Sequence, residues 1–353
     1  MAVRTRKSAL LSALAATLFG SAGGLAAGAG VAHAAVVITV AKSGGQYTSV
    51  QAAVNAVPNN SSTAYTISIG AGTYSETVSI PATKLHLTLL GATGNAADVT
   101  IQASNYAGET NPATGAAYGT EGSATVTVKA ANFTAEYITF SNAFNKNNFP
   151  GVTGSQAVAI SMEGDRQVYL HDKFYGHQDT LLTWGSTSSV ALRQYVYGSI
   201  VDGDVDFIFG DSTLVIDRST INVENDGIYS SGALTAPATW SSHAYGILIT
   251  GSTVASTLAA GTVYLGRAWV PSSGMVPQAV IRNTVLPAAI HSSAPWTGIS
   301  SATWTAGRYY EYANTGAGAT VNSNRPQLST SAAANYTAAK YLAGSDTWNP
   351  VAP

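Results

Sequence analysis

Two aspartates in the middle of the chain have surroundings that suit an acid/base pair. Asp179 follows an amide donor, Gln178, in the segment Gly176–Leu181, whereas Asp206 opens the apolar run Phe207–Phe209. Charged residues make up only 10% of the sequence, so this is its densest polar chemistry. A carboxyl beside a hydrogen-bond donor and one among aromatic rings can hold different protonation states. Aspartate near glycine is also a common turn residue, so both interpretations stand at this point.

Neutral helper groups accompany the two carboxyls elsewhere in the sequence. Gln156 enters an apolar segment and Gln178 adjoins Asp179, and side-chain amides can stabilise an oxyanion without adding charge. Arg267 lies two residues before Trp269 and could hold a carboxylate ionised through a two-pronged contact. Each residue alone is more often a ladder glutamine, a surface arginine or a core tryptophan. Their joint occurrence favours a hydrolytic site.

Several other chemistries are excluded by what the sequence lacks. It has no cysteine and no Gly-x-Ser-x-Gly element, which excludes a cysteine nucleophile and the commonest serine-hydrolase elbow. No two histidines have the spacing of a zinc site. The segment Asp202–Asp206 resembles the start of a calcium loop, but Phe207 and Thr213 stand where the turn glycine and the bidentate glutamate should be. We therefore expect neither a zinc site nor a calcium loop.

The first 34 residues have the pattern of a secretory signal peptide. A basic start, Arg4 to Lys7, precedes the small apolar stretch Ala9–Leu25, and Ala32–Ala34 fits a cleavage site. No charged stop-transfer segment follows, which argues against a membrane anchor. We expect residues 1–34 to be removed and residues 35–353 to form a protein secreted by a bacterium, without disulfides.

Charge and surface chemistry narrow the class of partner. The formal net charge is −2 and no basic run occurs beyond the leader, so neither nucleic acid nor an anionic membrane is expected to bind. Serine, threonine, asparagine and glycine replace the usual charged residues. A neutral surface that carries tyrosine and tryptophan suits a polysaccharide.

The pattern of apolar residues predicts an all-β fold. One helix is predicted over Tyr47–Val57, ended by Pro58. After it come short β-branched and aromatic segments separated by Gly, Asn, Asp and Ser.

A loose repeat within this pattern indicates how the strands are arranged. A strand, a small polar corner and one apolar residue recur, with closing residues 26, 21, 33 and 31 residues apart at Phe174, Ile200, Ile221, Val254 and Val285. Such spacing is typical of a right-handed, single-stranded parallel β-helix, whose coils bury their apolar faces by stacking. A β-sandwich is the alternative, although its strands usually follow one another more closely. No linker divides the chain, so one domain is predicted over 35–353, with the helix as its N-terminal cap.

The sequence resembles the pectin methylesterase (pectinesterase) family over nearly the whole region after the leader. The similarity rests on short motifs that follow one another in the family's order: Val40–Val54, Gly70–Glu76, Gln156–Ala159, Gln178–Leu181, Asp206–Gly210, Leu265–Trp269, Glu311–Gly316 and Trp348–Pro350. Each motif alone is weak evidence, but the ordered set is specific.

The resemblance implies a function and a role for each candidate. A family member would be a parallel β-helix that hydrolyses the methyl esters of pectin, a methylated homogalacturonan, and releases methanol. Asp206 would be the nucleophile and Asp179 the general acid and then the base. Gln178 and Gln156 would stabilise the oxyanion, and Arg267 would keep Asp206 ionised.

The same resemblance implies a substrate groove. Thr125, Phe209 and Trp269 would line it, together with Gln156 and Arg267. A monomer without metal or cofactor is expected.

Three positions depart from the family's pattern. Ala268 stands where proline is usual, and His177 and Leu182 stand where tyrosine is common. Fewer aromatic rings in the groove would change which stretch of substrate is preferred, whereas the core chemistry would be retained.

Other functions of a β-helix remain open from the sequence. A polygalacturonase would be expected to carry Asn-Thr-Asp and Gly-His-Gly elements, which are absent, and a pectate lyase would need a carboxylate cluster for calcium. A non-catalytic carbohydrate-binding β-helix, or an esterase or thioesterase that acts on another acyl substrate, would keep the same scaffold.

Overall fold

The computed structural model describes residues 35–225, 227 and 231–351. These residues belong to one compact unit. The predicted signal peptide, residues 1–34, lies outside the described residues. No helix in the described part of the chain is long and apolar enough to cross a membrane.

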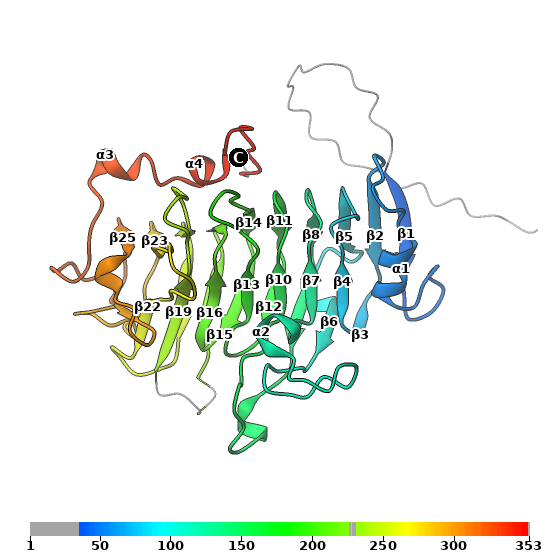
Figure 1. Cartoon of the computed structure of the whole chain (residues 1–353), viewed down its shortest axis with the longest axis horizontal. Coiled ribbons are helices and arrows are strands. Elements are labelled where there is room, and N and C mark those ends of the chain that lie inside the picture. The colour runs from blue at the N-terminus through cyan, green and yellow to red at the C-terminus, as the bar shows by residue number, and fades with distance from the viewer. Residues whose placement is uncertain (1–34, 226, 228–230, 352–353) are drawn as a thin grey trace, which may run out of the picture. The chain divides into compact units, whose positions relative to one another are not determined.

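Three parallel sheets run side by side along the unit, and each successive strand of a sheet comes from the next coil (Figure 1). Every strand pair in the three sheets is parallel. The predicted parallel β-helix is therefore confirmed, and the β-sandwich alternative is wrong. The chain visits the sheets in turn, so residues about one coil apart become neighbours.

The strands have the following bounds. Sheet A, with ten strands, contains β1 (Val36–Val40), β2 (Tyr65–Ile69), β5 (Leu87–Gly91), β8 (Thr134–Glu136), β11 (Gln167–Leu170), β14 (Arg193–Tyr197), β17 (Thr213–Asp217), β20 (Ile247–Thr250), β23 (Gln278–Arg282) and β25 (Arg308–Tyr312). Sheet B contains β3 (Gly72–Ser75), β6 (Val99–Ala103), β9 (Thr139–Asn142), β12 (Lys173–Tyr175), β15 (Ile200–Gly203), β18 (Thr220–Val223) and β21 (Thr253–Ser256). Sheet C contains β4 (Val78–Ile80), β7 (Val126–Val128), β10 (Ile160–Met162), β13 (Leu181–Thr183), β16 (Val205–Gly210), β19 (Gly232–Pro237), β22 (Val263–Ala268) and β24 (Trp296–Gly298).

Short helices lie outside the three sheets. They are α1 (Val50–Ala56), α2 (Gly119–Gly122), α3 (Thr330–Ala333) and α4 (Ala338–Leu342), with 3₁₀ turns η1 (Ala96–Asp98), η2 (Lys146–Asn148) and η3 (Trp304–Ala306). The segment that carries α3 and α4 runs along the outside of sheet A, where α4 contacts β14, β17 and β20.

The N-terminal helix α1 confirms the predicted helix and explains one of the recognised motifs. It begins at Val50 because the Ser49 side chain accepts a hydrogen bond from the Ala52 N–H. Both carboxylate oxygens of Glu76 also accept bonds from the first turn, from the N–H groups of Val50 (2.8 Å) and Gln51 (2.9 Å). The glutamate of the Gly70–Glu76 motif therefore caps a helix.

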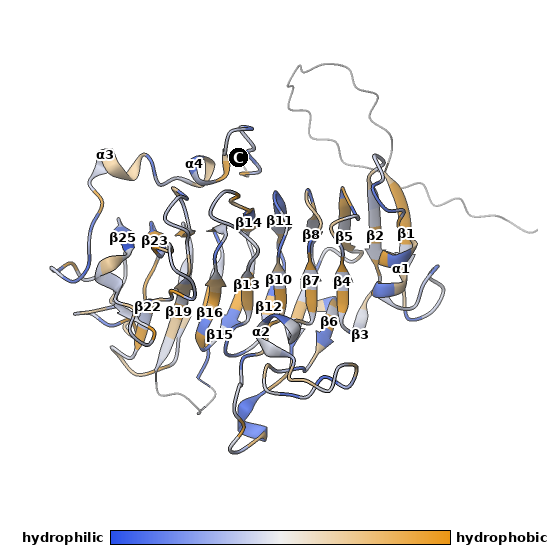
Figure 2. Ribbon diagram, viewed as in Figure 1, coloured by the Kyte–Doolittle hydropathy of each residue, from blue (hydrophilic) through white to orange (hydrophobic). Residues whose placement is uncertain are grey.

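Apolar side chains stack from coil to coil inside the frame, and apolar colour runs along β4, β7 and β10 in Figure 2. The rings of Phe140 and Phe174 stack with centroids 5.7 Å apart. Phe174 pairs with Val201 on the next coil. The predicted repeat placed Ile200 at this position, so it is wrong by one residue. It aligned Leu170 with Val196, whereas the strand partner of Leu170 is Tyr197.

The small polar corners of the repeat form a hydrogen-bonded ladder. The backbone N–H of Asp172 donates to Ser199 Oγ, that of Ser199 to Ser219 Oγ, and that of Ser219 to Ser252 Oγ, each at 3.1 Å. Serine recurs here because its hydroxyl satisfies a buried N–H group of the preceding coil. The ladder links successive coils at the corner between sheets A and B.

Candidate active site

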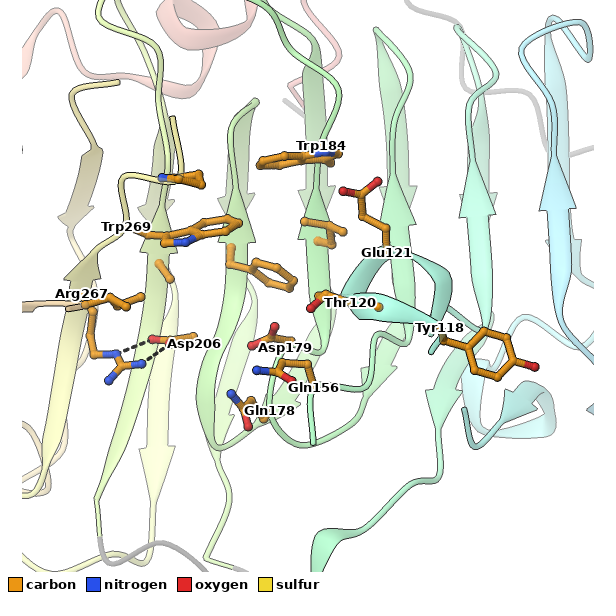
Figure 3. Close-up of a pocket in the computed structure, with 16 residues that line it drawn as sticks. Tyr118, Thr120, Glu121, Gln156, Gln178, Asp179, Trp184, Asp206, Arg267 and Trp269 are labelled. Carbon is orange, nitrogen blue, oxygen red and sulfur yellow. Dashed lines mark hydrogen bonds and ion pairs between the residues drawn. The ribbon is translucent and has the colours of Figure 1, made fainter. Parts of the chain in front are cut away.

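A groove of about 660 Å³ lies on sheet C. Its walls come from the segments just before β10 and β13, from β13, β16, β19 and β22, and from α2. The lining includes seven of the residues predicted to form the site: Gln156, Gln178, Asp179, Asp206, Phe209, Arg267 and Trp269. Figure 3 shows the two amides and Asp179 beside the Asp206–Arg267 pair, with Trp184 and Trp269 along the same groove.

Asp179 and Asp206 occupy equivalent positions on adjacent coils. Leu181 pairs with Ile208 across β13 and β16, and each aspartate lies two residues before its member of this pair. The Asp179 N–H also donates to Val205 O at 3.2 Å. Neighbouring strands lie about 4.8 Å apart, so the two backbones are held within one strand spacing. This confirms the prediction that the two carboxyls share one groove from neighbouring coils.

Both aspartates adopt a left-handed backbone conformation, with φ of 69° at Asp179 and 52° at Asp206. Residues other than glycine are uncommon there, and such strain of about 1–3 kcal/mol per residue persists only where the surroundings fix it. Here each aspartate lies two residues before the first pair of the β13–β16 ladder, Leu181 with Ile208. The strained turn directs both side chains into the groove rather than along the sheet.

Arg267 binds Asp206 with two parallel hydrogen bonds. Arg267 Nε donates to Asp206 Oδ1 at 2.8 Å, and Nη2 donates to Oδ2. The preceding residue must be glycine, because a Cβ at Gly266 would lie 2.4 Å from Thr235 Oγ1. Such a fork between guanidinium and carboxylate fixes orientation as well as charge. It leaves Asp206 rigid in the groove.

The two carboxyls differ in their electrostatic surroundings. Burial raises the pKa of Asp179 well above its usual value, and the charges of Asp206 and Asp204 raise it further. Burial also raises the pKa of Asp206, but the hydrogen bonds and charge of Arg267 oppose this rise. Asp206 is therefore the first of the two to ionise. The arrangement suits an ionised Asp206 next to a protonated Asp179.

The two glutamine amides are oriented for donation. Ser155 Oγ donates to Gln178 Oε1 at 3.0 Å, which identifies the carbonyl end of this amide and directs its NH₂ group elsewhere. Within the described residues, neither Gln178 Nε2 nor Gln156 Nε2 donates to a protein acceptor. Both groups are therefore available to an oxygen atom of a bound molecule.

An apolar wall completes the groove. Trp269 stacks on Trp184 with centroids 5.6 Å apart and lies 5.9 Å from Phe209. Leu182 is buried in the same cluster. Trp184 was not predicted from the sequence, although it follows β13 and lies five residues after Asp179. Such flat rings offer stacking surfaces to a sugar.

Within the described residues, no group of three or more His, Asp or Glu side chains is arranged to hold a metal ion. The polar groups that line the groove include the carboxyls of Asp179 and Asp206, the amides of Gln156 and Gln178, and the guanidinium of Arg267.

Comparison with known proteins identifies the family. The family model named Pectinesterase matches residues 36–345. The chain belongs to the pectinesterase family. It is 33% identical over 309 residues to a pectinesterase of Ralstonia solanacearum, covering 77% of each chain. It is 31% identical over 363 residues to pectinesterase A of Dickeya dadantii (strain 3937), covering 92% of this chain and 94% of that protein.

A solved structure agrees. The fold matches a crystal structure of a pectin methylesterase in complex with a hexasaccharide, with a TM-score of 0.77 and 29% identity, over 91% of this chain and all of that one. The pectinesterase resemblance of the sequence is therefore confirmed along almost the whole described chain.

One residue predicted to line the pectinesterase groove does not reach it. Thr125 is fully buried, and its Oγ1 donates to Ser141 O at 2.9 Å. Its backbone is also bound on both sides, with the N–H donating to Val158 O and the carbonyl accepting from Val78 N. The groove is lined instead by the preceding segment, through Tyr118, Thr120 and Glu121. No periodic apolar pattern marks that segment in the sequence.

The departure at His177 has a structural counterpart. His177 is not among the residues that line the groove; its Nδ1 lies 3.5 Å from Asp204 Oδ2 and its Nε2 lies 3.1 Å from Asn145 Nδ2. Asp204 is 1% exposed and accepts a hydrogen bond from the Val205 N–H. Asp204 and His177 thus form an acid–histidine pair close enough to Asp179 and Asp206 for the charge of Asp204 to raise the pKa of both carboxyls.

The other two departures are absorbed by packing. Ala268 is the buried last residue of β22, and its carbonyl accepts from the Ile299 N–H at 2.9 Å. Leu182 is 1% exposed and pairs with Phe209. Trp184 therefore supplies an aromatic face in a groove wall that has leucine at position 182.

Proposed function

We propose that this pectinesterase hydrolyses the methyl esters of galacturonosyl residues in pectin and releases methanol, with Asp206 as the nucleophile. One observation carries the assignment of roles: Asp206 lies in the guanidinium fork of Arg267, one strand spacing from the buried Asp179. The relative solved with a hexasaccharide supports a polymeric sugar as the substrate.

The first half of the reaction forms a covalent intermediate. A carboxylate oxygen of Asp206 attacks the ester carbonyl carbon, and the negative charge moves to the carbonyl oxygen. The NH₂ groups of Gln178 and Gln156 donate hydrogen bonds to this oxyanion. The bond to the methoxy oxygen then breaks, and the proton of Asp179 passes to that oxygen, so methanol leaves. An acyl anhydride with Asp206 remains.

The second half restores the enzyme. Asp179, now ionised, takes a proton from a water molecule that attacks the same carbonyl carbon. The anhydride bond breaks and returns its electron pair to Asp206, whose carboxylate is again stabilised by Arg267. The polymer keeps a free carboxyl group and Asp179 regains its proton. No oxidant, metal or cofactor is required.

The proposal also covers export, oligomeric state and sugar binding. Residues 1–34 are a secretory signal, and residues 35–353 act outside the cell as a monomeric enzyme that binds neither nucleic acid nor membranes. Phe209, Trp184 and Trp269 stack against the sugar rings. N-terminal sequencing of protein from the culture medium, with a start at Ala35 expected, tests the leader, and light scattering tests the monomer.

The decisive assay separates ester hydrolysis from chain cleavage. Highly methylated pectin should release methanol without becoming shorter and without unsaturated ends. Asp206→Asn should abolish release, while the matched change Asp98→Asn, at an exposed aspartate outside the groove, should leave it intact. Depolymerisation without methanol would overturn the proposal. Pectin binding without turnover would instead identify a carbohydrate-binding β-helix, and hydrolysis of only other acyl esters or thioesters would identify another acyl substrate.

A further inference from the structure

The side chains along the groove include more acidic groups than cationic ones. Among the described residues that line it, four can carry charge: Glu121, Asp179, Asp206 and Arg267. The single cation of this set is engaged by Asp206. Glu121 is exposed and has no cationic side chain within salt-bridge distance in the described chain. Once Asp206 and Arg267 cancel, Glu121 leaves the groove wall negative.

Glu121 lies beside the reaction centre rather than at it. It belongs to α2, just before β7, and β7 is two strands from β13 in sheet C. Two strand spacings correspond to about 10 Å along the stack. Figure 3 shows Glu121 and Arg267 on opposite sides of Asp179. On the proposed function, Glu121 lies where a sugar unit next to the one whose ester is hydrolysed would bind.

The nearest charges outside the groove do not neutralise this wall. Lys129 forms an ion pair with Glu163, with Nζ 3.3 Å from Oε2. Both affect Glu121: burial and Glu163 raise the pKa of Glu121, whereas Lys129 lowers it. Because this cation and anion are paired with one another, they supply no net positive charge to a substrate beside Glu121.

We propose that Glu121 is a specificity-determining residue that favours substrate in which the neighbouring galacturonosyl unit still carries its methyl ester. This inference rests on the proposed pectin methylesterase function. An esterified unit is neutral and meets Glu121 without repulsion. A de-esterified unit brings a carboxylate to the same wall, where no free cation of the lining is available to receive it.

The expected size of the effect follows from the exposure of Glu121. Interactions between exposed charges are weak, and one such repulsion corresponds to about a fivefold difference in kcat/KM. Salt should reduce the preference, because the screening length falls from about 30 Å at 0.01 M to about 3 Å at 1 M.

The test compares two forms of one pectin, highly methylated and randomly de-esterified by alkali, as kcat/KM for methanol release per remaining ester. The wild-type enzyme should prefer the highly methylated form, and less so in 1 M salt. Glu121→Gln should reduce the ratio of the two kcat/KM values about fivefold, with little change in kcat/KM for the highly methylated form. Glu121→Lys should reverse it. Glu136→Gln, the same charge change on sheet A, should leave it unchanged.

The outcomes separate this inference from the function on which it rests. If Glu121→Gln and Glu121→Lys keep the wild-type preference while all variants release methanol, the role of Glu121 is overturned and the esterase function stands. If the wild-type enzyme releases no methanol from either pectin, the proposed function itself fails.

Discussion

Arg267 reaches across an intervening strand to hold both carboxylate oxygens of Asp206. Arg267 lies on β22 and Asp206 on β16, with β19 between them in sheet C. Two strand spacings amount to about 10 Å, a gap that a long side chain with a planar fork can close. The proposed nucleophile, Asp206, is therefore oriented from two coils away, while the proposed acid, Asp179, comes from the adjacent coil on its other side.

Replacing this arginine by lysine should impair catalysis without removing the charge. In Arg267→Lys the fork is lost, so Asp206 gains rotational freedom and its pKa rises. We expect kcat to fall by about 10²-fold, the effect of misplacing a catalytic group by about 1 Å. The acid limb of the kcat/KM profile should move to higher pH. Arg218→Lys, at an exposed turn of sheet A, is the control; unchanged kinetics in Arg267→Lys would show that the fork is dispensable.

The pH profile should be a bell whose two limbs report the two aspartates. Activity requires Asp206 ionised, so it rises as pH passes the pKa of Asp206, and it requires Asp179 protonated, so it falls above the pKa of Asp179. Burial raises the pKa of both aspartates, and the pKa of Asp179 rises further than that of Asp206. Steady-state kcat/KM against pH measures both limbs. A profile with no alkaline limb would contradict a protonated Asp179.

Asp204 should set the position of that bell. Its charge raises the pKa of both Asp179 and Asp206, so Asp204→Asn should lower both and move both limbs to lower pH. The asparagine keeps an oxygen to accept the Val205 N–H, which preserves the turn. The matched change Asp98→Asn should leave the profile in place. If only one limb moves, Asp204 affects the pKa of only one of the two carboxyls.

The amides should act on the transition state rather than on binding. Gln178→Ala removes an oxyanion donor, and loss of one such donor lowers kcat by about 10²–10³-fold, with KM nearly unchanged. Ser155→Ala leaves the amide present but releases its carbonyl end, so a smaller loss is expected. A large rise in KM at constant kcat in Gln178→Ala would assign this amide to substrate binding instead.

The sequence predicted the parts of the site that lie on strands or just before them. Asp179, Asp206 and Arg267 lie in short motifs tied to the strands β13, β16 and β22. Strand register places Asp179 and Asp206 at equivalent positions, and the long Arg267 side chain reaches Asp206 across β19. The prediction that Thr125 lines the groove did not hold, because the sequence places Thr125 next to a strand but does not show the face on which its side chain lies. Glu121 was missed because α2 lies in an insertion whose position depends on tertiary packing.

The fold was predicted to the level of coils but not to the residue. Spacing of the polar corners indicated stacking, and the serine ladder accounts for that spacing. The exact register depends on which of two adjacent apolar residues points inward, as with Ile200 and Val201. Hydropathy cannot distinguish the two residues, because both are apolar and β-branched. The pairing of Tyr197 with Leu170 decides which of them lies beside Phe174.

The motif Glu311–Gly316 should prove structural rather than catalytic. Glu311 is 2% exposed and Arg325 is 1% exposed, and Arg325 donates from Nε at 2.8 Å and from Nη2 at 2.6 Å to the two carboxylate oxygens. Glu311→Gln leaves a buried guanidinium without its counter-charge. We expect the free energy of unfolding to fall by about 3–5 kcal/mol.

Urea unfolding of Glu311→Gln, followed with the methanol assay, checks this expectation. The kcat of the folded fraction should equal the wild-type value, because Glu311 lies outside the groove. Glu163→Gln is the matched control: it loses an ion pair whose lysine is 56% exposed, so its stability should change by about 1 kcal/mol or less. Equal stability of the two variants would mean that burial adds nothing to the Glu311–Arg325 pair, and that the last coil is held closed by its backbone ladder and aromatic packing.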